Sequence, residues 1–345
     1  MKILKGSLVL FKADRLNNLY VCNANPICDK ICVNSIKSDM TNLWHNRLGH
    51  MSSKGLETLH KQGCFGNDKL SCMPFCESCV YGKQHRVSFP TAPNPKVTVC
   101  STVLEYVHAD VWGPASEPTQ GGNRYFLSII DDFSRKVWVF LLKNKSDVFD
   151  SFKNWKTLTE NQTGKKIKTL RTDNGLEFCN SLFDELCEQC GIKRHKTNPY
   201  TPQQNGVVER MNRTLLERVR SMLVSSGLSK KFWGECVLTA AFLINRSPSV
   251  PLDGKCPESV WSGKEIDYSH LRTFGCTAFA HKRGDKLEPR AVKCVFLGYP
   301  EGVKGYRLWV RSEPGFRTIV SRDVTFNETE FPSFFVAILK NPISH

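Results

Sequence analysis

The sequence predicts an α/β protein in which a mixed sheet covered by helices lies between a small zinc-binding helical module and a small β-barrel. Three observations lead to this fold class. The first is an alternation of strand-like and helix-like segments between residues 103 and 225. The second is a pair of histidines followed by Cys-x-x-Cys between residues 41 and 90. The third is a series of short strand-like segments between residues 267 and 330.

The central segment has the element order β-β-β-α-β-α-β-α. Its strands are expected in LEYVHADVW, RYFLSIIDDFS, KVWVFLLK, KIKTLRTDN and IKRHKTNP. Its helices are expected in SDVFDSFKNWKTLTENQT, LEFCNSLFDELCEQCG and NGVVERMNRTLLERVRSMLVSSG, the last two closed by Gly191 and Gly227. The first three strands are joined by short connections and should be antiparallel. The later strands follow helical crossovers and can pair in parallel.

Composition and element order divide the chain into seven segments. They are a β-hairpin region (1–40), a zinc-binding module (41–90), a proline-containing linker (91–102), the α/β core (103–225), a helical extension (226–266), a small β-barrel (267–330) and a tail (331–345). The barrel strands are expected in FGCTAFAHK, VKCVFLGYP, KGYRLWV and FRTIVSRDVTF.

The chain has 345 residues and a formal net charge of +15, from 48 Lys and Arg against 33 Asp and Glu. This excess favours a polyanionic partner, most often nucleic acid, although a basic protein without such a partner has the same composition. No segment approaches the roughly 20 apolar residues of a membrane span, and the N-terminus lacks a signal peptide. We therefore expect no membrane partner and reduced thiols for the 15 cysteines. Spaced cysteines in that setting indicate metal before disulfides.

Three acidic residues far apart in the sequence can converge in this fold. Asp110 lies on the first core strand, Asp173 ends the fourth, and Glu209 lies in the first turns of the last helix. The first and fourth strands can be neighbours, and the last helix can lie across their ends. Converging carboxylates repel one another unless cations neutralise them, and Mg²⁺ (or Mn²⁺) takes oxygen ligands. Two such ions about 3.5–4 Å apart can clamp both oxygens of a phosphoryl displacement.

Other acids offer alternatives to this triad, since most acidic residues are solvated surface groups. Asp131 and Asp132 are interpreted as ending a strand and shaping a turn. Glu177, four residues after Asp173, is interpreted as part of the first turn of a helix.

A His/Cys set precedes the core. His45 and His50 are followed by Cys76 and Cys79 in CESC, and two imidazoles with two thiolates give a closed tetrahedral zinc site of the structural kind. A segment of about 45 residues has little core, so the metal would stabilise it directly. Three further side chains between these ligands are alternatives: His60, Cys64 and Cys72.

Two other cysteine pairs carry less information. Cys187 and Cys190 form a second C-x-x-C, but they lie in a helical segment without a histidine pair, and packing is the better interpretation. Cys28 and Cys32 have no obvious partners and stay unassigned.

Basic and amide side chains near the core are candidates for DNA contact, with a solvated surface as the alternative for each. The candidates are Lys193, Arg194, Lys196, Gln204, Asn205, Arg210 and Arg213. Arg210 and Arg213 are the better candidates for the DNA backbone because they lie close to Glu209.

The motifs HADVWGP, IIDDFSRKVWVF, RTDNGLEF and PYTPQQNGVVERMNRTLLERVRSML together resemble the integrase region of plant copia-type LTR retrotransposon Pol polyproteins. The resemblance covers nearly the whole chain. It implies an RNase H-like catalytic core whose D,D-35-E acids match Asp110, Asp173 and Glu209. It also implies a pre-integrase HHCC zinc module at 41–90, and an SH3-like barrel in the region DKLEPRAVKCVFLGYPEGVKGYRLW.

The resemblance further implies a retrotransposon integrase, a polynucleotidyl transferase that uses two metal ions. Its reactions would be 3′-end processing and strand transfer of element cDNA into target DNA. The implied partners are the cDNA ends, the target DNA and further copies of the chain, since two ends must be inserted together. A nuclear location follows from this function alone, with a cytoplasmic particle as the second location.

Two other functions remain open at this stage. A catalytically silent, DNA-binding remnant of a truncated element would keep the same residues, because the sequence begins at the pre-integrase region and lacks the other polyprotein parts. A generic RNase H-like nuclease would use the same acids, but the zinc module argues against it.

Overall fold

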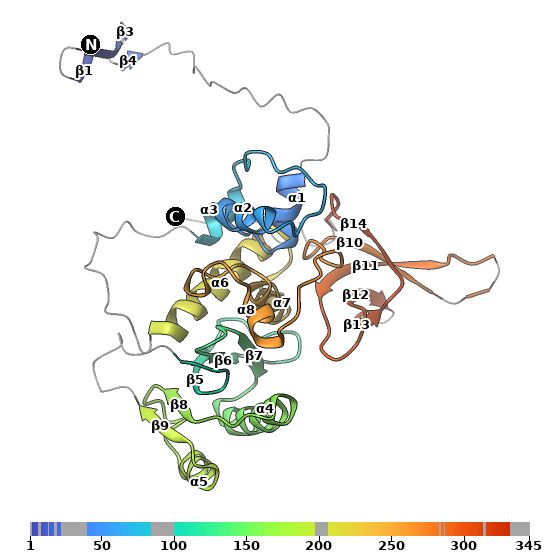
Figure 1. Ribbon diagram of the computed structural model, residues 1–345. Helices are drawn as coiled ribbons and strands as arrows, with labels where there is room; N and C mark the ends of the chain where they lie inside the picture. Colours follow the sequence, from blue (N-terminus) through green and yellow to red (C-terminus); the bar gives the residue numbers. More distant parts are fainter. Residues whose placement is uncertain are drawn as a thin grey trace. The chain divides into compact units, whose positions relative to one another are not determined.

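A computed structural model describes residues 2–5, 8–12, 14–16, 19–21, 40–83, 100–196, 206–282, 284–285, 287–312 and 315–331 (Figure 1). The N-terminal unit, Met1–Ser38, carries two antiparallel strand pairs. These pair β1 (Lys2–Lys5) with β2 (Leu8–Lys12) and β3 (Asp14–Leu16) with β4 (Leu19–Val21). Everything from Asp39 onwards forms a second unit. No helix among the described residues is long and apolar enough to cross a membrane.

The centre of the second unit is a five-stranded mixed sheet in the order β7-β6-β5-β8-β9. Its strands are β5 (Tyr106–Trp112), β6 (Tyr125–Asp131), β7 (Val137–Leu142), β8 (Thr169–Thr172) and β9 (Lys193–Lys196). The first three are antiparallel neighbours, whereas β8 pairs in parallel with β5, and β9 with β8. The predicted meander followed by parallel crossovers is therefore confirmed.

Helices cover both faces of this sheet (Figure 1). One face packs against α4 (Val148–Thr163) and α5 (Ser181–Cys190) around a core that includes Val107, Ile129 and Leu170. The other face packs against α6 (Gly206–Ser226) and α7 (Trp233–Asn245) around a core that includes Phe126 and Val139. Side chains alternate between the two faces of a strand, so neighbouring residues on β5 and β6 enter different cores.

The remaining elements flank this core. They are α1 (Met40–Arg47), α2 (Ser53–Lys61), α3 (Glu77–Lys83), α8 (Pro257–Ser262) and the short 3-10 helices η1 (Lys145–Asp147), η3 (Lys230–Phe232) and η4 (Val250–Leu252). The C-terminal strands are β10 (Thr277–His281), β11 (Ala291–Gly298), β12 (Tyr306–Ser312), β13 (Gly315–Ser321) and β14 (Val324–Asn327). They form one antiparallel sheet in the order β13-β12-β11-β10-β14, which fits a small β-barrel with its own core.

Two sequence-based expectations were wrong. The segment LEFCNSLFDELCEQCG was expected to be helical throughout, but α5 begins at Ser181 because the Asn180 side chain caps the helix by accepting a hydrogen bond from the Phe183 N–H. Glu177 therefore lies in the turn before the helix. The segment FRTIVSRDVTF was expected to be one strand, but it forms β13 and β14, which pair with different neighbours.

A side chain from the helical extension forms hydrogen bonds with the outer edge of strand β7. Buried Asn245 of α7 accepts a hydrogen bond from the Val137 N–H at 2.9 Å and donates one to the Val137 carbonyl at 2.8 Å. These bonds replace those of a missing neighbouring strand, since β7 pairs only with β6. The extension is thereby fixed to the core sheet.

We predict that Asn245→Ala lowers the free energy of unfolding by about 2–3 kcal/mol, because it leaves two buried backbone groups of Val137 unpaired. Chemical denaturation measures the loss. The control is Asn161→Ala, on the exposed surface of α4, which should change stability by no more than about 0.5 kcal/mol. Equal effects of the two substitutions would contradict the assigned role.

Candidate functional site

Three elements carry the residues of the predicted acidic triad. Asp110 lies on β5, Asp173 directly follows β8, and Glu209 lies in the first turn of α6. The parallel register pairs His108 with Arg171, so Asp110 and Asp173 each lie two residues further along adjacent strands. Side chains two residues apart share one face of a strand, so both acids lie on the face that α6 crosses.

An apolar stripe on α6 fixes this helix on the sheet. Val208, Leu215, Val219 and Met222 are buried in the core that the helix shares with the sheet, at spacings that place them on one side of the helix. Glu209, next to Val208, is therefore turned away from that core and is exposed.

The electrostatics of Asp110 show that the three carboxylates interact. Burial, first of all, raises the pKa of Asp110 to about 6, and the negative charges of Asp173 and Glu209 add to the shift. A hydrogen bond from Asn212 Nδ2 to Asp110 Oδ2 at 2.8 Å opposes it. The negative charge of Asp110 is therefore energetically unfavourable in this environment, and a nearby cation would stabilise it.

A groove of about 510 Å³ opens beside these acids. Asp110, Glu209 and Asn212 line it together with Arg213 and Arg220, whereas Asp173 is not among its lining residues. The Arg213 side chain is mostly exposed and has only a loose ion pair with Glu217 at 4.0 Å. The groove thus combines carboxylates with at least one cation that is free to contact a ligand.

The alternative acids have other structural partners. Buried Asp131 accepts hydrogen bonds from the Leu104 and Ser134 N–H groups, which confirms that it shapes a turn. Asp132 is bound to His108 at 3.0 Å and to Arg135 at 2.9 Å.

Glu177 forms an ion pair with Lys145 at 2.9 Å. None of these three alternative acids lines the groove beside Asp110.

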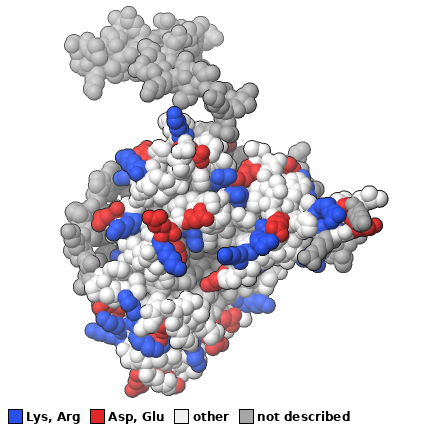
Figure 2. Space-filling model, turned by 45° about the vertical axis from the view of Figure 1, so that its right-hand side comes forward, with Lys and Arg blue, Asp and Glu red and all other residues white. Residues whose placement is uncertain are grey.

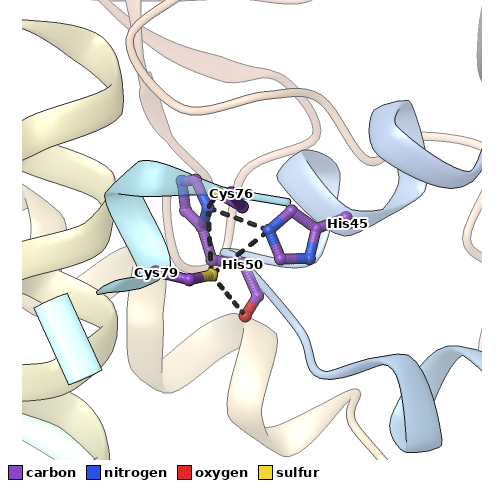
Figure 3. A group of neighbouring side chains, drawn as sticks. All are labelled: His45, His50, Cys76 and Cys79. Atoms are coloured by element: carbon purple, nitrogen blue, oxygen red, sulfur yellow. Dashed lines mark hydrogen bonds between the residues drawn. The ribbon is translucent and has the colours of Figure 1, made fainter. Parts of the chain in front are cut away.

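The second cluster joins the four predicted His and Cys ligands. Figure 3 shows His45, His50, Cys76 and Cys79 pointing toward one another, and their ligand atoms all lie within 4.8 Å of one another. The His45 Nε2 atom lies 3.1 Å from His50 Nδ1 and 3.3 Å from Cys79 Sγ, and Cys76 Sγ lies 3.4 Å from His50 Nδ1. Tetrahedral zinc with N and S ligands has edges of roughly 3.3–3.8 Å, so the set has the right dimensions for a metal ion.

The surroundings of the two histidines prepare them as ligands. Burial lowers the pKa of His45 to about 4 and that of His50 to about 3, so both rings are neutral at neutral pH. The other ring nitrogen of each histidine forms a hydrogen bond outside the cluster. His45 Nδ1 lies 2.6 Å from the Met51 carbonyl oxygen, and His50 Nε2 lies 2.9 Å from Ser225 Oγ. Such outer contacts fix the ring orientation and the tautomer of metal ligands.

The remaining His and Cys candidates do not join this group. Among the described residues, no group of possible metal ligands includes His60, Cys64 or Cys72. Cys187 packs in the core beneath α5 and Cys190 is exposed, so no metal group forms there within the described ranges. Cys28 and Cys32 lie outside the described residues.

The structure places some of the predicted DNA-contact residues at the surface and turns one of them inward. On the face drawn in Figure 2, Lys and Arg are interspersed with Asp and Glu. The Arg194 guanidinium is turned inward, donating to the Phe178 carbonyl at 2.9 Å and lying 5.4 Å from the Phe183 ring centroid, so a phosphate contact is not supported for it. Lys196 lies 3.8 Å from Asp184.

Two of the other predicted contacts lie at the surface. Lys193 and Arg210 are exposed, whereas Gln204 and Asn205 lie outside the described residues. Sequence reasoning did not name Asn212 or Arg220 as site residues, and both line the groove from α6. The asparagine had a usable signal, since it lies three residues after Glu209 on the same helix.

Comparison with known proteins identifies the class that this architecture belongs to. The GAG-pre-integrase domain matches residues 18–84, the integrase core domain matches residues 102–202, and the retroviral polymerase SH3-like domain matches residues 276–335. The chain thus has the domain composition of a retroelement integrase, with an RNase H-like core and an SH3-like barrel.

Full-length relatives specify the family. The chain is 47% identical over 334 residues to the Retrovirus-related Pol polyprotein from transposon TNT 1-94 of Nicotiana tabacum, an alignment that covers 95% of this chain and 24% of the relative. It is 33% identical over 300 residues to the corresponding polyprotein from transposon RE2 of Arabidopsis thaliana, covering 84% of this chain and 20% of the relative. The chain therefore belongs to the Pol polyprotein family of plant retrotransposons, as predicted, and spans about a quarter or less of the length of these relatives.

A solved structure gives a weaker match. A chain of the simian T-cell lymphotropic virus intasome, in a complex with PP2A regulatory subunit B56 gamma, is 16% identical and has a TM-score of 0.41. The match covers 73% of this chain and 87% of that chain. A TM-score this low supports no further conclusion.

We predict that Cys79→Ser weakens metal binding at the His/Cys cluster by at least about tenfold and lowers the unfolding temperature, because one of four ligands is lost. Metal content by mass spectrometry and thermal unfolding measure the two effects. Exposed Cys72→Ser, a matched control in the same module, should retain the full metal content. Metal retained by the Cys79 variant would contradict the assigned ligand set.

We also predict that Asp110→Asn stabilises protein purified without magnesium by about 1–2 kcal/mol, because it removes one of three repelling charges. Thermal unfolding measures the gain, and added Mg²⁺ or Mn²⁺ should stabilise the parent protein more than the variant. The control is Asp150→Asn. Asp150 is an exposed residue of α4, so this substitution should change stability by no more than about 0.5 kcal/mol. A destabilised Asp110 variant would contradict this account.

Proposed function

We propose that the chain is the DNA-integrating part of its polyprotein and carries out strand transfer of element cDNA into target DNA. Trimming of the cDNA 3′ ends would precede strand transfer where the ends require it. The observation that carries the proposal is the placement of Asp110 and Glu209 in one groove that also presents Arg213, with Asp173 near enough to Asp110 to raise its pKa. The integrase core domain that matches this segment supports a polynucleotidyl transferase.

The acidic cluster fits hard divalent cations. Its oxygens are the donor type that Mg²⁺ and Mn²⁺ prefer, and the raised pKa of Asp110 reflects a repulsion that a bound cation would offset. Asp110, Asp173 and Glu209 would hold such ions, which would supply charge stabilisation at the attacking and leaving oxygens of a phosphodiester.

The protein's own contribution is orientation. The hydrogen bond from Asn212 fixes the Asp110 carboxylate, and the buried stripe of α6 fixes the helix that carries Glu209. Arg213 and the exposed Arg210 lie on the same helix, where they would bind the DNA backbone. No side-chain nucleophile is required, because a water or a 3′ hydroxyl attacks directly.

The His/Cys cluster fits zinc in a structural role. Two neutral imidazoles and two cysteines are a common zinc ligand set, and four protein ligands leave no position open for a substrate. Burial raises the pKa of the Cys79 thiol to about 11, so metal binding would have to displace its proton. We assign this site to folding of the 40–83 segment.

The proposed partners follow from the reaction and from the net charge of +15. The chain would bind two cDNA ends and target DNA as a homo-oligomer, and it would act in the nucleus, after assembly in a cytoplasmic particle. The SH3-like barrel adds no residue to the acidic groove, so we assign it to DNA binding or to contacts between copies of the chain.

We predict that Glu209→Gln reduces strand transfer at least about a hundredfold, because the helix-borne metal ligand is lost while the fold is kept. The assay uses the purified zinc-loaded chain, Mg²⁺ or Mn²⁺, and a labelled duplex with the element's own terminus. The control is Glu188→Gln, at an exposed residue of α5, which should retain activity.

Three outcomes of this assay distinguish the functions. Joined products that depend on Glu209 support integration. Cleavage of the duplex without joining would indicate a nuclease instead. A folded chain that binds DNA but neither cuts nor joins it would indicate a catalytically silent remnant.

A further inference from the structure

A second cavity, of about 530 Å³, lies on the core sheet where β5, β8 and β9 run side by side. Its lining includes Tyr106 and His108 from β5, Arg171 from β8, and Lys193 and His195 from β9. We call it the Arg171 pocket. None of these five residues lines the groove beside Asp110.

The Arg171 pocket shares a sheet face with the acidic triad. Side chains two residues apart point to the same side of a strand, so Tyr106 and His108 lie on the face of Asp110, and Arg171 lies on the face of Asp173. Two residues of a strand span about 6.6 Å, so Arg171 lies roughly that far along β8 from the acids.

Helices leave this part of the face open among the described residues. On this face α6 contacts β5 and β6, and α7 contacts β7, whereas α4 and α5 pack on the opposite face (Figure 1). The pocket is therefore a polar recess beside α6, rather than a gap within a hydrophobic core.

The acids at the pocket are already paired, whereas two of its cations are not. Asp132 is bound by His108 and Arg135, and Glu105 is bound by Lys168 at 3.0 Å. Within the described ranges, no ion pair involves Arg171 or Lys193. The pocket therefore presents positive charge that carboxylates of the described chain do not neutralise.

Several polar groups in the pocket also lack partners. Arg171 Nε is buried without a hydrogen bond among the described residues. His108 Nδ1 is also buried and unpaired there, but it is the acceptor nitrogen of a ring whose Nε2–H faces Asp132 at 3.0 Å. Arg171 Nη1 donates to Tyr106 Oη at 3.3 Å, and Tyr106 Oη lies 3.0 Å from His195 Nδ1. Buried donors are almost always satisfied, so the unpaired Arg171 donor is complementary to an acceptor-rich ligand.

We propose that the Arg171 pocket binds a backbone phosphate of DNA about two nucleotides away from the phosphodiester at the acidic triad. Guanidinium and ammonium groups with a phenol hydroxyl form charge-assisted hydrogen bonds to phosphate oxygens. The separation from the acids corresponds to about two nucleotides, at 3.4 Å of helix rise each. The inference rests on the proposed function, because it names where that function's substrate is held.

The test measures DNA binding without catalysis. The full zinc-loaded chain is titrated with a labelled duplex of arbitrary sequence over a range of salt concentrations, by fluorescence anisotropy and without Mg²⁺. Each lost phosphate contact should reduce the slope of log K against log salt by about 0.9, which is about eightfold in affinity at 0.1 M salt. We expect this loss for Arg171→Gln and for Lys193→Gln, with most of the slope restored in Arg171→Lys.

The matched control is Lys153→Gln, an exposed lysine on α4, which packs on the opposite face of the sheet. It should keep the parent slope. Circular dichroism verifies the fold of every variant, and the exposed Lys193 gives a readout even where an Arg171 variant is unstable.

The two hypotheses fail separately. Equal slopes for the Lys193 variant, the control and the parent would overturn the phosphate site, as would a parent chain that binds no DNA. Binding that depends on Arg171 and Lys193, without strand transfer by the parent, would support the phosphate site and overturn the proposed function.

Discussion

The packing of α6 is the constraint on which the rest of the second unit depends. The first turn of this helix carries Glu209, its middle is buried against the core sheet, and its C-terminal half contacts the His/Cys module. Arg218 donates to the Leu48 carbonyl at 2.9 Å, and Arg220 donates to the Gly82 carbonyl at 2.9 Å. One rigid helix therefore links the metal cluster to the acidic groove.

The contact between α3 and α6 is unusually close, and glycine makes it possible. A β-carbon at Gly82 would collide with Ser221, so any other residue would push the two helices apart. Ser225, one turn further along α6, holds His50 Nε2. A displacement of α3 would thus be transmitted both to a metal ligand and to the helix that carries Glu209. The small His/Cys module therefore packs against the helix that also contacts the core sheet.

The sequence predicted the elements of the fold, the strand pairing of the core and the candidate ligands, but not local caps or the orientation of individual side chains. Apolar periodicity located α6 as the last helix of the core, and the His and Cys spacing identified a cluster that the structure brings together. Local capping escaped the pattern, because Asn180 starts α5 with a single hydrogen bond. Arg194 was predicted to contact DNA because it lies in a basic run. Only the pairing of β9 with β8, and the packing of α5 beneath them, shows that its guanidinium is turned inward.

The sheet face explains the apparent conflict between acidic and basic groups in this protein. Tyr106, His108 and Asp110 lie on one side of β5, so the strand passes from neutral polar groups to a carboxylate within five residues. β8 passes in the same direction from Arg171 to Asp173. Because the two strands are parallel and in register, both gradients run the same way and reinforce each other. An antiparallel pairing of these two strands would have brought Arg171 next to Asp110, where its positive charge would have neutralised the carboxylates. The parallel crossover after α4 thus keeps cations and carboxylates apart on one surface, as binding a phosphate chain and holding metal ions both require.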